Sequence, residues 1–130
     1  MQKPTPHRGM RHLALYVTQL DACLHFYESL LGMKVVWKPD ADNIYLSSGD
    51  DNLALHRAPS DFVLAKHQRL DHFGFFLEQP QQVDEWHEYL KANDVEIKAV
   101  PKDHRDGTRS FYCADPDGNV VQMIYYPVNS

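Results

Sequence analysis

The sequence predicts an α+β fold built from two copies of one βαβββ unit. The stretch HLALYV at positions 12–17 returns as HFGFFL at positions 72–77, an offset of 60 residues. The same offset aligns the apolar positions of two amphipathic helical stretches, where Leu30 corresponds to Leu90. Two units that share one plan can bring matching side chains together around a pseudo-two-fold axis. A duplication of this kind can build one metal or ligand pocket from residues far apart in the chain.

The first unit is expected to span residues 11–57. Residues 11–17 alternate between apolar and polar side chains in the pattern of a strand. Asp21 is expected to cap a helix that runs to about Leu31, and Gly32 suits the left-handed residue that ends a helix. Three short strands complete the unit, at residues 34–38, 43–47 and 52–56.

The second unit is expected to span residues 70–127, after a linker at residues 58–69. Its first strand, residues 73–77, is almost wholly apolar and is therefore expected to be buried on both faces. Pro80 is expected to begin the second helix. A type I turn is predicted for the DPDG sequence at residues 115–118. The remaining strands are expected at residues 95–100, 108–114 and 119–126.

The bulk composition favours one compact domain that spans residues 1–130. A hydrophobic fraction of 43% supports a substantial core. A half of about 60 residues would bury too little surface to fold stably alone. The net charge is −5 and the chain has no basic run, which argues against a nucleic-acid partner. We therefore expect a small-molecule substrate or ligand.

The sequence also bears on the cellular compartment. It has no apolar stretch of about 20 residues that could span a membrane, and its start lacks the apolar core of a signal peptide. Cys23 and Cys113 are the only cysteines and are interpreted as reduced thiols that fill the core, with a catalytic cysteine as the less favoured alternative. A cytoplasmic protein without membrane contact is expected.

Several local features, taken in order along the chain, resemble the vicinal oxygen chelate superfamily, also called glyoxalase/bleomycin resistance/dioxygenase. They are the strand-one histidine, the Phe26-Tyr27 pair, the LGM helix end at residues 31–33 and the DPDGN turn at residues 115–119. The resemblance covers residues 11–127. It implies that the two modules form an open, U-shaped, eight-stranded mixed sheet around a central pocket, usually within a homodimer.

Enzymes of this family place metal ligands on the first and last strands of each module. By position, the ligands implied here are His12, His72 and Gln122, which would hold a divalent ion such as Fe, Mn, Ni or Zn. The fourth position falls near Ala54, which cannot bind a metal, and His56 on the same face is an alternative. Gln122 stands where the family usually has Glu, and a neutral carbonyl oxygen coordinates more weakly than a carboxylate, so a hydrogen-bonding pocket residue is the alternative for this position. For any one histidine the competing interpretation is a core or rim residue, but the matched positions of His12 and His72 favour metal binding.

A second pattern, in the second module, resembles the extradiol ring-cleaving dioxygenase signature. It runs from His104 through Phe111-Tyr112 and the DPDG turn to Gln122, and departs from the signature at Lys102 and Gln122. The resemblance implies that His104 and Tyr112 are acid/base or hydrogen-bonding groups beside the metal, although His104 could equally be a solvated loop residue and Tyr112 a core residue. Arg109 is expected either to bind an anionic substrate group or to pair with a cross-strand acid.

These observations favour a divalent-metal-dependent enzyme that acts on a small substrate with two neighbouring oxygens. A dioxygenase-like role is preferred to a glyoxalase-like isomerase, because an isomerase needs a carboxylate base beside the metal and the two carboxylate positions hold Gln122 and Ala54. The first alternative is a metal-free protein that sequesters a drug, of the bleomycin-resistance type. The second is thiol transfer to an epoxide antibiotic, as in fosfomycin-modifying relatives.

Overall fold

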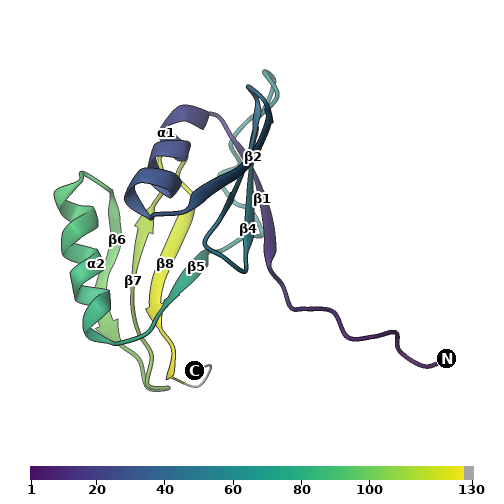
Figure 1. Ribbon diagram of the computed structural model, residues 1–130. Helices are drawn as coiled ribbons and strands as arrows, with labels where there is room; N and C mark the ends of the chain where they lie inside the picture. Colours follow the sequence, from purple (N-terminus) through teal and green to yellow (C-terminus); the bar gives the residue numbers. More distant parts are fainter. Residues whose placement is uncertain (128–130) are drawn as a thin grey trace. The chain divides into compact units, whose positions relative to one another are not determined.

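The computed structural model describes residues 1–127 and contains two compact units, Met1–Asp61 and a second unit that begins at Phe62. Each unit has one four-stranded mixed sheet and one helical region (Figure 1). The predicted α+β class with two βαβββ modules is therefore confirmed. Within the described residues, no helix is long and apolar enough to cross a membrane.

The first unit follows the order βαβββ. Strand β1 (His12–Val17) leads into the helical segments α1 (Leu20–Leu24) and η1 (His25–Leu30), which are followed by the strands β2 (Lys34–Asp40), β3 (Asn43–Ser47) and β4 (Asn52–Arg57). The strand order is β1-β4-β3-β2, with β1 parallel to β4 and the other pairs antiparallel. Each short strand expected in this unit is present, and β2 and β4 extend slightly further than predicted.

The helical region of the first unit differs from the expected continuous α-helix. It begins at Leu20 with Gln19 as the N-cap, so the expectation that Asp21 caps the helix is wrong. Asp21 lies instead in the first turn, where a negative charge favours the positive end of the helix dipole. The second half is wound as a π-helix, with a hydrogen bond from the amide of Leu31 to the carbonyl of Phe26 five residues earlier. Gly32 ends the helix with φ of +81°, as predicted.

The second unit repeats the plan. It contains β5 (Phe73–Leu77), α2 (Gln81–Ala92), β6 (Ile97–Asp103), β7 (Arg109–Ala114) and β8 (Val120–Tyr125). The strand order is β5-β8-β7-β6, with β5 parallel to β8 and the other pairs antiparallel. Pro80 is the N-cap of α2, one residue before the helix that it was expected to begin.

The predicted turn between β7 and β8 is confirmed. The amide of Gly118 donates to the carbonyl of Asp115 at 2.9 Å, which is the i to i+3 bond of a β-turn. The Asp115 carboxylate also accepts bonds from the backbone amides of Asp117 and Asn119, at 3.0 and 2.9 Å. The side chain of the first residue therefore satisfies the amides that the turn leaves without a strand partner.

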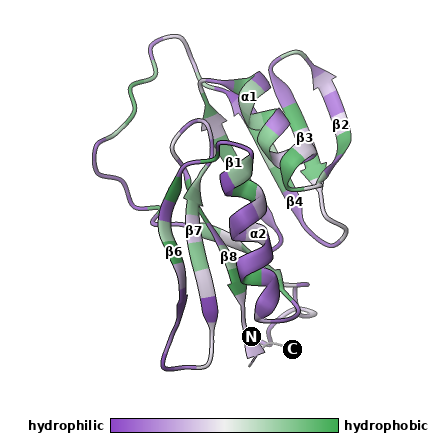
Figure 2. Ribbon diagram, turned by 90° about the vertical axis from the view of Figure 1, so that its left-hand side faces the viewer, coloured by the Kyte–Doolittle hydropathy of each residue, from purple (hydrophilic) through white to green (hydrophobic). Residues whose placement is uncertain are grey.

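One face of the second sheet is covered by α2, which packs on β6, β7 and β8 (Figure 2). The side chains that fill this layer are fully or almost fully buried; they are Val83, Leu90, Phe111, Cys113, Val121 and Met123. Because side chains alternate along a strand, their neighbours Tyr112 and Gln122 lie on the opposite face and are partly exposed. A small molecule can reach the side chains on this open face of the second unit from solvent.

The expectation that the first strand of the second unit is buried on both faces is wrong. The exposure of β5 alternates along the strand, and the side chain of Phe76 is 64% exposed. β5 is an edge strand, so its backbone has a partner on one side only. An apolar run predicts a strand, but it does not reveal which strands of a sheet lie at the edge.

Both cysteines are buried and unbonded to sulfur, as predicted. Burial raises the pKa of the Cys113 thiol to about 12, and the nearby charge of Asp115 acts in the same direction. A thiol with so high a pKa carries almost no thiolate at neutral pH and is a poor nucleophile. Cys113 therefore fills the core and offers no support for a catalytic cysteine.

Gly74 allows β5 and β8 to approach each other closely. It lies opposite Gln122 in the parallel register, and a Cβ added at this position would come within 2.5 Å of the Gln122 carbonyl oxygen. The corresponding pair of the first sheet is Ala14 and Ala54, so that sheet tolerates two methyl groups where the second has a glycine and a long side chain. The position of Gln122 therefore depends on a glycine in the neighbouring strand.

We predict that Gly74→Ala destabilises the protein by about 1–3 kcal/mol, because the added methyl group must push the backbone of β8 away. Urea denaturation measures the change. Ala14→Gly in the first sheet is the matched control and should lower the free energy of unfolding by less than about 1 kcal/mol, through chain entropy alone. A Gly74→Ala protein as stable as the original would contradict the close contact.

Candidate functional site

Three of the residues singled out in the sequence gather on the open face of the second sheet. Tyr112 and Gln122 face each other across the β7–β8 pair, and the Gln122 Nε2 donates to the Tyr112 hydroxyl oxygen at 3.1 Å. The ring of His72, just before β5, meets the ring of Tyr112 edge-on, with centroids 5.1 Å apart. Tyr112 therefore connects the histidine to the glutamine and orients both.

His72 is held by a carboxylate. Its Nδ1 lies 2.6 Å from Oδ2 of Asp71, the preceding residue. An ionised carboxylate can only accept a hydrogen bond, so Nδ1 must carry the hydrogen. In the neutral imidazole the lone pair is then on Nε2, which is the form of histidine that binds a metal through Nε2.

His12 in the first unit is held in the same way by a different residue. Its Nδ1 lies 2.7 Å from Oδ1 of Asn52, which is its partner in the β1–β4 register. An amide oxygen also only accepts, so the lone pair of the neutral His12 ring is again on Nε2. His12 borders a surface hollow of about 420 Å³ together with Arg8, Arg11 and the turn residues 49–52.

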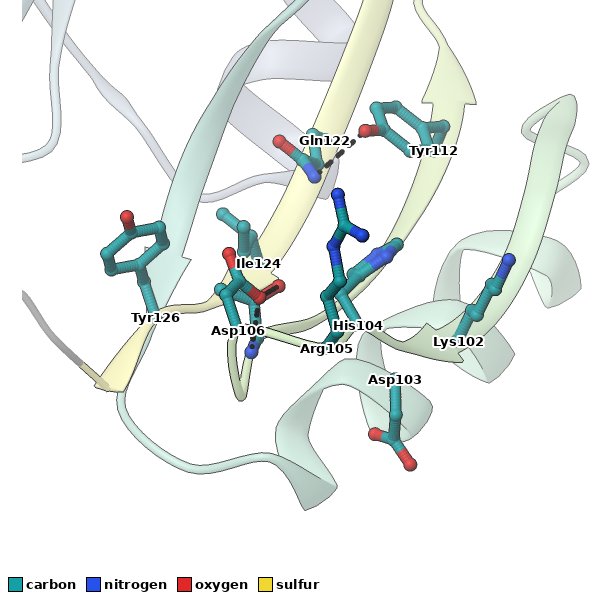
Figure 3. Close-up of a pocket in the computed structure, with 10 residues that line it drawn as sticks. Lys102, Asp103, His104, Arg105, Asp106, Tyr112, Gln122, Ile124 and Tyr126 are labelled. Carbon is teal, nitrogen blue, oxygen red and sulfur yellow. Dashed lines mark hydrogen bonds between the residues drawn. The ribbon is translucent and has the colours of Figure 1, made fainter.

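The chemistry of these side chains fits a divalent ion. Metal-binding histidines usually donate their second ring N–H to an oxygen acceptor, as His12 and His72 both do. The Gln122 amide donates through Nε2 and so directs its carbonyl oxygen away from Tyr112, as Figure 3 shows. Within residues 1–127, however, no three His, Cys, Asp or Glu side chains form a group that could hold a metal ion.

The position expected near Ala54 holds no ligand. Ala54 lies opposite Ala14 exactly as Gln122 lies opposite Gly74, so the register makes residues 54 and 122 equivalent. His56, the alternative, is two residues further along β4, with its Nδ1 2.6 Å from Oδ1 of Asn43 and its ring beside Tyr16 and Tyr45. His56 lies four residues along β4 from Asn52, the residue that contacts His12, and four strand residues span about 13 Å. We therefore leave His56 out of the ligand set.

A hollow of about 540 Å³ opens on the same face, beside Gln122 and Tyr112 (Figure 3). Its other walls are Ile124, Tyr126, Thr108 and the loop between β6 and β7, including His104. The His104 Nε2 lies 3.0 Å from Oγ of Ser110, a buried residue of β7. The loop therefore holds His104 against the sheet, at the border of the hollow.

Arg109 lies on the other face of the sheet and does not join this group. Its guanidinium contacts Asp84 of α2 at 2.7 Å and Asp103 of β6 at 3.1 Å. The bonds from Arg109 hold the pKa of the Asp84 carboxyl below its ordinary value, and the two carboxylates raise the pKa of Arg109. The structure thus shows the cross-strand ion pair that was the alternative for this residue, and we do not carry Arg109 into the site.

The sequence did not point to the residues that hold the histidines. Asn52 lies 40 residues from His12 and becomes its neighbour only through the strand register. Ser110, the partner of His104, is a buried residue of β7 that carries no signal of its own in the sequence. Asp71 alone carried a readable signal, since an acidic residue directly precedes the strand histidine.

Comparisons with known proteins identify the family and the fold. The sequence profile of the Glyoxalase/Bleomycin resistance protein/Dioxygenase superfamily matches residues 9–123. The chain is 25% identical to metallothiol transferase FosB of Staphylococcus epidermidis, over 88% of this chain and 80% of that protein. It is 30% identical to a probable trivalent organoarsenical cleaving enzyme of Bacillus subtilis, over 92% of this chain and 81% of that protein. The crystal structure of lactoylglutathione lyase from Agrobacterium tumefaciens matches with a TM-score of 0.74 and 26% identity, covering 93% of this chain and 96% of that one.

We predict that Arg109→Gln lowers the free energy of unfolding at pH 7 by about 0.5–1 kcal/mol, the scale of a partly exposed ion pair. The pKa of Asp84 is lower in the folded protein, so this stabilisation is complete above the unfolded value of about 3.9 and disappears as the pH falls through the folded value. Urea denaturation at several pH values should therefore show the two proteins converging below about pH 4.

Arg57→Gln is the matched control, because Arg57 pairs with Asp42 in the first unit at the same distance of 2.7 Å but with greater exposure. Arg57→Gln should lower the free energy of unfolding by less than Arg109→Gln does. A difference between Arg109→Gln and the original protein that stays constant down to pH 2 would show that the arginine acts through packing and not through the ion pair.

Proposed function

The chain belongs to the Glyoxalase/Bleomycin resistance protein/Dioxygenase superfamily and has its fold, and from this we propose that it is a divalent-metal-dependent enzyme acting on a small substrate with two neighbouring oxygens. The proposed ligands are His12, His72 and Gln122. We also propose that residues 1–130 act as one domain of this family, with modules at 11–57 and 70–127, and that the protein works as a homodimer.

One observation carries the proposal. The strand-one histidines of the two modules, 60 residues apart, each have Nδ1 bound to an oxygen that can only accept. His56 has the same kind of contact, so the argument rests on the matched positions of His12 and His72 in the two modules. A pair fixed in this way presents two Nε2 lone pairs, as a shared metal would require.

The neighbouring side chains would then orient the ligands and the substrate. Tyr112 fixes the Gln122 amide, so that the carbonyl oxygen and not the nitrogen is presented as a ligand. His104 borders the hollow in contact with Ser110 and is the group best placed to hold or move a substrate proton. When bound, a divalent ion would polarise the substrate oxygens as a Lewis acid or activate oxygen.

The choice of reaction rests on what stands at the two carboxylate positions. Isomerisation of the glyoxalase type needs a carboxylate base beside the metal, whereas this chain has Ala54 and Gln122 there. Ring-cleaving or oxygen-dependent chemistry can instead use His104 as the proton-carrying group, so a dioxygenase-like role is preferred. The names of two relatives, a metallothiol transferase and an organoarsenical cleaving enzyme, favour a second candidate, which is metal-assisted group transfer or bond cleavage.

We predict that the protein binds a divalent metal and that His12→Ala and His72→Ala each lose most of it. Elemental analysis of protein purified without an affinity tag or chelator measures the metal content. Near-stoichiometric Fe, Mn, Ni or Zn is expected in the original protein, and circular dichroism should show that both variants keep their fold.

The matched control is His56→Ala, because this histidine also has Nδ1 bound to an amide oxygen but is not a proposed ligand. It should keep its metal. If the original protein carries no metal and takes none up on reconstitution, the enzyme proposal fails and the alternative of a metal-free, drug-sequestering protein becomes the better one. Equal loss from all three variants would likewise contradict the ligand assignment.

We predict that Gln122→Glu tightens divalent metal binding by about tenfold or more, because it adds a negative charge to the ligand set. The Tyr112 hydroxyl, which now accepts from the glutamine, can donate to a carboxylate, so the arrangement should survive the change. Isothermal titration with the metal found in the original protein measures the affinity, and Gln122→Met should weaken it. Equal or weaker binding by Gln122→Glu would show that residue 122 does not touch the metal.

A further inference from the structure

The hollow beside Gln122 is lined by basic residues in a protein whose net charge is −5. Lys102, His104 and Arg105 all border it, from the end of β6 and the loop that follows. Asp103 and Asp106 border it as well, so the sequence alone would suggest a neutral mixture. The contacts of each side chain determine which charges the hollow offers to a ligand.

Both acidic side chains are engaged elsewhere. Asp103 pairs with Arg109, which lies on the face covered by α2, and in Figure 3 its carboxylate points away from the hollow. Asp106 turns its carboxylate back onto its own loop, where Oδ1 accepts from the Thr108 amide at 3.0 Å and from the Thr108 hydroxyl at 2.7 Å. These bonds hold the pKa of Asp106 below its ordinary value. The acidic groups therefore stabilise the loop.

The basic side chains face the other way. Lys102 lies opposite Ser110 in the β6–β7 register and Asp103 lies opposite Arg109, so strand alternation puts the lysine on the open face and the aspartate on the covered one. In Figure 3 the Arg105 guanidinium reaches from the loop toward the Gln122–Tyr112 pair. Within residues 1–127 neither Lys102 nor Arg105 forms a salt bridge. The hollow thus presents two positive charges, on Lys102 and Arg105, against the one negative charge of Asp106, which Thr108 binds but does not neutralise.

We propose that this hollow recognises an oxyanion group of the substrate, a carboxylate, phosphonate or phosphate, with Arg105 as the main contact and Lys102 as the second. A guanidinium matches the two oxygens of such a group and binds them with paired hydrogen bonds. The volume of about 540 Å³ suits a small molecule. The inference rests on the proposed function for the orientation of the substrate, whose neighbouring oxygens would lie toward Gln122, but binding of the anion itself requires no metal.

The test is a titration of metal-free, ¹⁵N-labelled protein with methylphosphonate, with acetate, and with the uncharged acetamide, all at constant ionic strength. Amide shifts in the NMR spectrum report binding site by site. Saturable shifts around Tyr112, Gln122 and the β6–β7 loop are expected with either anion and not with acetamide. The anion that binds more tightly identifies the group.

Substitutions distinguish a specific anion-binding site from non-specific electrostatic attraction of the anion to the protein. Arg105→Gln should weaken anion binding by about tenfold, the scale of one charge-assisted contact, and Lys102→Gln by less. Arg105→Lys keeps the charge and should restore part of the affinity. Lys91→Gln removes one positive charge from α2, on the other side of the sheet, and should leave the affinity unchanged.

The absence of saturable shifts in the original protein would overturn the proposal. The same holds if Arg105→Gln binds as tightly as the original, or if Lys91→Gln weakens binding equally. The metal analysis of the histidine variants is a separate measurement, so a failure of the metal proposal is recognised independently of the anion result. Saturable anion binding that depends on Arg105 would support the hollow as a substrate site even in a protein without metal.

Discussion

The parallel pairing of the first and last strand in each unit is the constraint on which the rest of the structure depends. It sets residue 14 opposite residue 54 and residue 74 opposite residue 122, and so fixes which side chains share a face. A shift of this register by one residue would exchange the two faces of a strand, sending Gln122 into the layer under α2 and Val121 onto the open face. In the second unit Gly74 secures the register, because only a residue without a Cβ fits against the Gln122 carbonyl.

Much of this arrangement could be predicted from the sequence, because the chain repeats one βαβββ pattern. The 60-residue repeat located both strand-one histidines, and Gly32 and the DPDG turn marked a helix end and a strand connection where the structure has them. Strand alternation by itself decides the face on which Arg109 lies. This residue is three residues from Tyr112, and an odd separation along a strand places two side chains on opposite faces. The sequence left Arg109 open between an anion-binding residue and the partner of a cross-strand acid, and the structure shows its ion pairs with Asp84 and Asp103.

Other features depended on information that single-chain patterns do not contain. The apolar run of β5 looked fully buried because a sequence does not show which strand ends at the edge of a sheet. The capping expectation for Asp21 failed because the helix starts one residue earlier, a difference that lies within the ordinary variation of helix ends. The partner of His12 is 40 residues away, and the direction of the Asp103 and Lys102 side chains follows from the β6–β7 register. Apart from the helix end, each of these outcomes is a consequence of strand pairing.

The replacement of a carboxylate by Gln122 links the two proposals by charge. A divalent ion held by two neutral imidazoles and one amide oxygen would keep its full positive charge, which would be costly to hold away from water. Asp71 offsets part of that charge through the His72 ring, but its own side chain is 92% exposed and its influence is screened. An anionic substrate seated on Arg105 would bring further negative charge next to the ligand set and take the place of the missing carboxylate. On this reasoning metal and anionic substrate should favour each other's binding, which a ligand set with its own glutamate would not require.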